Sequence, residues 1–224
     1  MRRRRIVFAA SIAALPLLPA RAFNLSEGDA NAGIRAALER GAQAAVASLG
    51  RRDGFLGNPL VRIELPGYLK DAARLLRATG QGARLEELVT AMNRAAEAAV
   101  PVAKPLLVKA VKDMSVEDGV RILRGGDDSV TQFFEGKTRE PLSRQFLPIV
   151  TQATEKVALA DKYNAVARKA GSLGLVRGDE ASIQQYVTAR ALDGLYRLIG
   201  EEEKKIRRDP VGTGSAILKK VFGG

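Results

Sequence analysis

The sequence contains no cysteine, no histidine and no tryptophan in its 224 residues. A chain without cysteine forms no disulfide and carries no thiol nucleophile, so its stability must come from packing alone. A chain without histidine lacks the imidazole base and the commonest metal ligand. Aromatic residues make up 5% of the chain. These absences exclude thiol and imidazole catalysis and leave carboxylates as the main groups available for chemistry.

The first 22 residues have the layout of a removable bacterial export signal. Four arginines, Arg2–Arg5, precede a mostly apolar run at 6–18, and small residues follow up to Ala22. The run has 13 residues and contains Pro16. A membrane-spanning helix needs roughly 20 apolar residues. We therefore expect cleavage after Ala22, not a retained anchor, and a periplasmic location.

Removal of residues 1–22 is expected to leave a single domain over residues 23–224 that has no membrane span. The leader holds five arginines and no acidic residue, so the formal charge of +11 falls to about +6 in the mature chain. This smaller surplus weakens the case for nucleic-acid binding, and we expect no nucleic-acid partner. An anionic small molecule, an envelope protein or lipid head groups are the expected partners of a basic exported protein.

Helix-forming residues dominate the composition and β-branched runs are few, which predicts an all-α fold. We expect a single-domain irregular bundle of about seven to nine helices, together with one short extended segment near 61–65, where apolar and charged residues alternate. The predicted helices lie at residues 30–49, 67–79, 83–99, 106–111, 115–123, 139–157, 159–170, 180–208 and 216–222, with a further one around 130–134.

Four phrases of the sequence point to a known family. They are DGFLGNP at 53–59, VRIELP at 61–66, AMNRAAEAA at 91–99 and EEEKKIRRDPVG at 201–212. With these phrases in this order, the chain resembles a family of exported bacterial proteins catalogued as domain of unknown function 4197, over about residues 25–222. The resemblance implies a helical, single-domain exported protein. It brings no activity, cofactor or catalytic residue.

Three polar residues sit beside the apolar stripe of the helix predicted at 83–99. Asn93 and Glu97 are four residues apart and share one face, and Arg94 is three residues from Glu97 and can reach it. If buried, this group lines a polar pocket in which Glu97 orients a ligand or acts as a general base. If exposed, it is an intrahelical ion pair beside a solvated amide.

The glycine-rich loop at 51–59 is the preferred binding candidate. Arg51, Arg52 and Asp53 lie close in sequence to Phe55 and Asn58. Guanidinium groups beside an aromatic ring can clamp a phosphate, a carboxylate or a sugar. The alternative is that Phe55 plugs the core and the loop is structural.

The sequence Gly-Gly-Asp-Asp-Ser at 125–129 offers a weak metal candidate. Its carboxylates, Asp127 and Asp128, are oxygen ligands of the kind that calcium and magnesium prefer. The spacing of an EF-hand loop is missing, and Asp or Ser at this point is also what a helix N-cap needs. Capping of the next helix by Asp127 or Asp128 is the favoured interpretation.

The C-terminal segment 216–222 reads as a short basic amphipathic helix, which either docks against the domain or lies on an anionic membrane. From these features we expect a non-catalytic periplasmic binding or envelope-support protein without a cofactor. Two alternatives stay open. One is a hydrolase that uses carboxylates such as Glu97, Asp127 and Asp128, with a divalent metal ion. The other is a protein that associates with lipid through its C-terminal helix.

Overall fold

The computed structural model describes residues 27–69, 73–74, 77–155, 160–165 and 182–209. The predicted leader at 1–22 and the predicted helix at 216–222 lie outside the described residues, as do parts of the helices predicted at 67–79 and 159–170.

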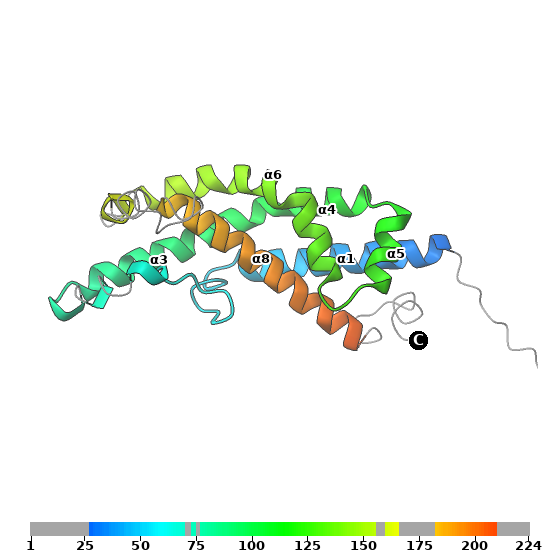
Figure 1. The fold of residues 1–224 in the computed structure, drawn as a ribbon, viewed down its shortest axis with the longest axis horizontal. Coiled ribbons are helices and arrows are strands. Elements are labelled where there is room, and N and C mark those ends of the chain that lie inside the picture. Colours follow the sequence, from blue (N-terminus) through cyan, green and yellow to red (C-terminus); the bar gives the residue numbers. More distant parts are fainter. Residues whose placement is uncertain (1–26, 70–72, 75–76, 156–159, 166–181, 210–224) are drawn as a thin grey trace, which may run out of the picture.

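The described residues form helices and contain no strand, which confirms the all-α prediction. The six long helices shown in Figure 1 are α1 (Glu27–Leu49), α3 (Gly82–Ala99), α4 (Ala103–Lys112), α5 (Val116–Arg124), α6 (Ser129–Thr154) and α8 (Ile183–Arg208). Two short 3-10 turns, η1 (Gly67–Leu69) and η2 (Val100–Val102), join them. The expected seven to nine helices are slightly too many, in part because two of them are a single helix, α6.

Helix α6 is one continuous helix that contains Pro141 and Pro148. The sequence predicted two helices here, with a break between residues 134 and 139. Its buried residues recur every fourth position: Val130, Phe134, Thr138, Leu142, Phe146, Val150 and Thr154. A row with this spacing turns by about 40° at each step around a helix with 3.6 residues per turn. Helix α6 therefore contacts α8, α3, α4 and α5 with successive faces. Burial of this row outweighs the one hydrogen bond that each proline removes.

Most other helix ends fall where local signals place them. Helix α1 stops before Gly50, and α8 ends with Asp209 as its C-cap. Proline at 101 and 105 coincides with η2 and the restart of the chain as α4. The capping box of α5 is formed, since Ser115 Oγ accepts from the N–H of Asp118 at 3.1 Å and the Asp118 carboxylate accepts from the N–H of Ser115. These boundaries confirm the sequence predictions.

The centre of the molecule is the crossing of α8 with α6, α3 and α1 (Figure 1). Phe55, from the loop after α1, is completely buried at this crossing and packs on Gly194 of α8. A Cβ at Gly194 would lie only 2.7 Å from the Phe55 ring. The loop therefore enters the core at a place where α8 leaves room for it. No helix in the described ranges combines the length and the apolar character that a membrane crossing requires.

Candidate functional site

Asn93 of α3 joins the helix to the segment predicted to be extended. Its side-chain oxygen accepts from the N–H of Ile63 at 2.8 Å, and its amide nitrogen donates to the carbonyl of Ile63 at 2.9 Å and to that of Val89 at 2.8 Å. Residues 62–66 form neither helix nor strand, so this carboxamide satisfies the main chain of Ile63 as a neighbouring strand would. Asn93 is fully buried and is used by the fold.

Glu97 binds the loop one turn further along α3. Its Oε1 accepts from the backbone N–H groups of Phe55 at 3.0 Å and Leu56 at 3.1 Å, and its Oε2 accepts from Arg94 at 2.6 Å. Arg94 also donates to Asp53 at 2.7 Å. Hydrogen bonds to Glu97 and Asp53 raise the pKa of Arg94. The predicted contact between Arg94 and Glu97 is present. These hydrogen bonds of Glu97 and Arg94 hold the loop against α3, and we call them the latch.

The loop itself is tightly folded. A Cβ at Gly54 would lie 2.3 Å from the carbonyl oxygen of Leu49, so only glycine fits there. The side chain of Asn58 accepts from the N–H of Leu60 within a turn. Phe55 is completely buried in the core, so its ring is not available to stack on a ligand. This agrees with the alternative interpretation, in which the loop is structural.

Of the predicted binding residues, all but Arg51 and Arg52 are thus used by the fold. Asp53, Arg94 and Glu97 form one network, with the Phe55 main chain bound to it. Arg51 and Arg52 are exposed, and within the described residues neither side chain makes a hydrogen bond or ion pair.

The two aspartates predicted as caps or metal ligands, Asp127 and Asp128, lie directly before α6. Asp128 occupies the N-cap position of α6, but its carboxylate accepts from the side chain of Gln132 at 2.8 Å and makes no hydrogen bond to the helix backbone. Asp127 is exposed. In the described part of the chain, no cluster of three or more acidic side chains is suited to hold a metal ion. Asp128 is therefore the N-cap residue of α6, as predicted, but its side chain does not make the expected capping hydrogen bond.

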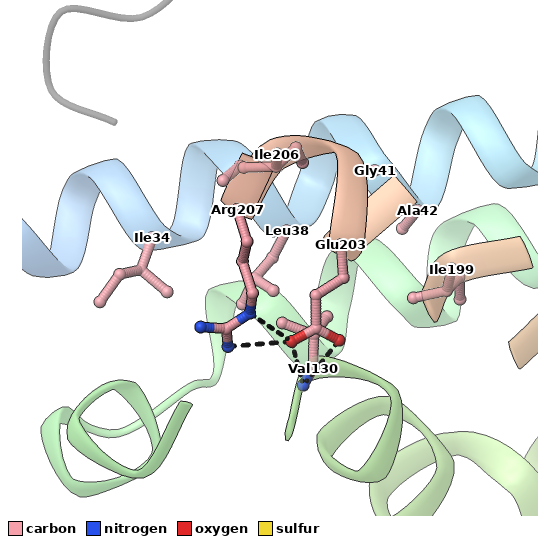
Figure 2. Close-up of a pocket in the computed structure, with 10 residues that line it drawn as sticks. Ile34, Leu38, Gly41, Ala42, Val130, Ile199, Glu203, Ile206 and Arg207 are labelled. Carbon is pink, nitrogen blue, oxygen red and sulfur yellow. Dashed lines mark hydrogen bonds and ion pairs between the residues drawn. The ribbon is translucent and has the colours of Figure 1, made fainter. Parts of the chain in front are cut away.

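The group that satisfies the first turn of α6 is Glu203 of α8, which the sequence analysis missed. Figure 2 shows its carboxylate between Arg207 and the backbone nitrogen of Val130. It accepts from the N–H groups of Val130 at 3.2 Å and Thr131 at 3.4 Å, and from Arg207 Nε at 3.0 Å. Burial raises the pKa of Glu203, although Val130 and Arg207 act in the opposite direction. A buried anion at a helix N-terminus also complements the helix dipole.

Glu203 and Arg207 close a narrow apolar pocket between α1 and α8 (Figure 2). Its free volume is about 20 Å³, which is room for about one water molecule. The remaining lining comes from aliphatic side chains such as Ile34 and Leu38. This pocket is part of the packing between helices and too small for an organic ligand.

A larger opening lies between α5 and α6, and we refer to it as the α5–α6 groove. Its volume is about 570 Å³, within the roughly 300–1,000 Å³ that is typical of ligand sites. Three glycines line it, Gly125, Gly126 and Gly136, together with Phe133. The charged and amide side chains that face it are Asp118, Arg121, Asp128, Gln132 and Lys137.

Two cations in the groove share one carboxylate. Arg121 Nη1 and Lys137 Nζ each lie 3.8 Å from an oxygen of Asp118, which is longer than the distance of about 3 Å in a hydrogen bond. Asp118 is nearly buried and also closes the capping box of α5, so its position is fixed. Over the described ranges, neither cation donates a hydrogen bond to the protein. Their donors are thus available to a ligand.

The comparisons with known proteins give a family but no function. A family model described as a protein of unknown function (DUF4197) matches residues 24–223. No curated protein and no solved structure matches the chain.

Proposed function

The chain belongs to the DUF4197 family, whose description assigns no activity, and we propose from its geometry that it is an exported, non-catalytic binding protein. In this proposal the α5–α6 groove holds a small anionic ligand in the periplasm. The leader at 1–22 supports the location, and the family match begins at residue 24, directly after the predicted cleavage site.

The observation that carries the proposal is the arrangement of Arg121 and Lys137 around Asp118. Two positive charges lie around the single carboxylate of Asp118, whereas Asp128, the other charged residue of the groove, brings the total charge of the lining to zero. A carboxylate or phosphate between the two cations would complete their hydrogen bonds, and such charge-assisted bonds are among the strongest in proteins. Asp128 and Gln132 supply acceptors and donors for a second polar part of the ligand. The site is thus suited to an anion that also carries hydrogen-bonding groups.

The glycines of the groove support an open site. Gly136 lies within α6, where glycine costs roughly 1 kcal/mol relative to alanine. A Cβ at this position would meet nothing within 4 Å, so packing does not require the glycine. A larger side chain there would project into the groove. The missing side chain keeps the groove free.

The experiment is an NMR titration of the mature chain at low salt with inorganic phosphate, citrate and the anionic dipeptide N-acetyl-Ala-Ala. We expect saturable shifts of the backbone amides of Gly125, Gly126 and Gly136 with at least one of these anions. Gly136→Leu should abolish the shifts of the first two glycines without loss of stability, because it fills the groove from an exposed helix position. Arg121→Gln with Lys137→Gln should also abolish them, because both donors are removed.

The matched control is Gln145→Leu, which adds the same side chain at an exposed position of α6 outside the groove. This variant should bind like the wild type. Equal binding by Gly136→Leu and Gln145→Leu would contradict the proposal, as would the absence of saturable shifts with all three anions.

A further inference from the structure

The solvent side of α5 carries an apolar surface that no described residue covers. Val116 and Val120 are one turn apart on this helix, and they are 51% and 39% exposed. They line a shallow hollow of about 640 Å³ together with Glu117, Arg121, Arg124 and Gly125. We call it the α5 hollow. Removal of exposed valine side chains from water is favourable, so a segment that covers them would be stabilised.

The described chain ends beside this surface. Arg207, in the last turn of α8, donates to the carbonyl oxygen of Ile122 in α5 at 2.9 Å and to Ser129 Oγ at 2.7 Å. In Figure 1 the end of α8 and helix α5 lie at the same end of the molecule. Residues 210–224 follow directly after Asp209. The first of these residues therefore start close to the C-terminal end of α5.

The sequence after Asp209 has the length and the composition of a cover. Residues 210–215, with one proline and two glycines, can span up to roughly 20 Å when extended. Helix α5 has nine residues and is therefore only about 14 Å long. The apolar residues that follow are Ile217, Leu218, Val221 and Phe222, which share one face of a helix.

Further observations favour this segment over another occupant. The family match extends to residue 223, so the segment is part of the family unit. A two-turn helix is also unstable in water unless it packs against something.

We infer that residues 216–222 dock on the α5 hollow and cover Val116 and Val120. The inference does not depend on the proposed function, since its test requires no ligand.

The absence of cysteine allows a direct test. In the mature chain at micromolar concentration, Val120→Cys with Val221→Cys should form an intramolecular disulfide under mild oxidation, measured by intact-mass spectrometry. The control pair is Leu147→Cys with Val221→Cys. Leu147 is also an exposed hydrophobic residue, but it lies roughly 25 Å along α6 from the end next to α5. We expect the first pair to form its disulfide at least tenfold faster, because docking raises the effective concentration of the two thiols.

A second variant tests whether apolar packing causes the difference. Phe222→Ser in the first pair should slow the disulfide to the rate of the control pair. Equal rates for the two cysteine pairs would overturn the inference. So would disulfides that form only between chains, which would assign the hollow to a second copy. Loss of the intramolecular disulfide on adding phosphatidylglycerol vesicles, with the protein bound to them, would assign the segment to a membrane surface.

Discussion

Replacement of Glu97 by alanine tests whether the polar face of α3 is a latch for the loop. Glu97 is buried, and its carboxylate accepts from the backbone N–H groups of Phe55 and Leu56 and from Arg94. In Glu97→Ala, the two backbone donors lose their acceptor. Because Phe55 is completely buried, water cannot replace the carboxylate there without opening the loop.

The size of the effect follows from the number of bonds lost. Each buried donor left unsatisfied costs roughly 1–3 kcal/mol, so Glu97→Ala should lower the free energy of unfolding by about 3–5 kcal/mol. A domain of this kind has about 5–15 kcal/mol in total, so the loss is large. Glu97→Gln keeps one oxygen for the two N–H groups, but it loses the charge and places an NH2 donor where Oε2 accepts from Arg94. We expect a smaller loss for this variant, about 1–2 kcal/mol.

The assay is urea denaturation, combined with hydrogen exchange at the amides of Phe55 and Leu56. Glu97→Ala should remove the protection of both amides. The control is Glu86→Ala on the same helix, whose side chain is 59% exposed and forms only long ion pairs. It should change stability by less than about 0.5 kcal/mol. Equal stability of the Glu97→Ala and Glu86→Ala variants would refute the latch.

Three further predictions follow from buried and exposed polar groups. Glu203→Ala should lower the free energy of unfolding by about 2–4 kcal/mol in urea, because the first turn of α6 loses its acceptor, whereas Glu202→Ala should cost little. Burial raises the pKa of Tyr196 to about 12 from its usual 10. The unfolded state therefore releases this proton first, and stability should fall by up to about 2–3 kcal/mol between pH 10 and 12; Tyr196→Phe should remove that part of the decline. Arg51→Ala with Arg52→Ala should leave the urea midpoint unchanged, since both side chains are exposed; a clear drop would show that they are structural.

Helix boundaries could be predicted because most are local. Gly50 after α1, the Ser115–Asp118 box and the prolines around η2 act within a few residues of the ends that they define. The course of α6 through Pro141 and Pro148 could not be predicted in this way. It depends on a buried row that contacts four other helices, and that packing is a property of the whole fold.

The candidate site was predictable only in its local part. The spacing of Arg94 and Glu97 correctly indicated their contact within α3. The same spacing does not show that Glu97 binds Phe55 and Leu56, which are more than 40 residues away. Polar residues beside an apolar stripe look alike whether they bind a ligand or the protein's own main chain.

Glu203 left a signal that could have been used. Three consecutive glutamates occur at 201–203, and both Glu202 and Glu203 lie three or four residues from Ile199 and Ile206. This spacing places both near the buried face of α8, and the structure shows that Glu203 is the buried one. Gly136 could also have been noticed, because glycine is unfavourable inside a helix and usually has a packing or functional role there. The sequence does not show that α5 lies beside this part of α6, so it does not show that Gly136 lines a groove.

Glu97 and Glu203 perform the same task at two places in the molecule. Each is a buried carboxylate on one helix that accepts N–H groups from a segment distant in sequence, and each is paired with an arginine on its own helix, Arg94 or Arg207. In a chain without disulfides, these two anchors fix the loop after α1 and the start of α6. Their hydrogen-bonding capacity is used by the fold. The anionic ligand that we propose would therefore be recognised by cations whose donors the described protein does not use. Arg121 and Lys137 in the α5–α6 groove meet that condition, as do Arg51 and Arg52 in the loop after α1.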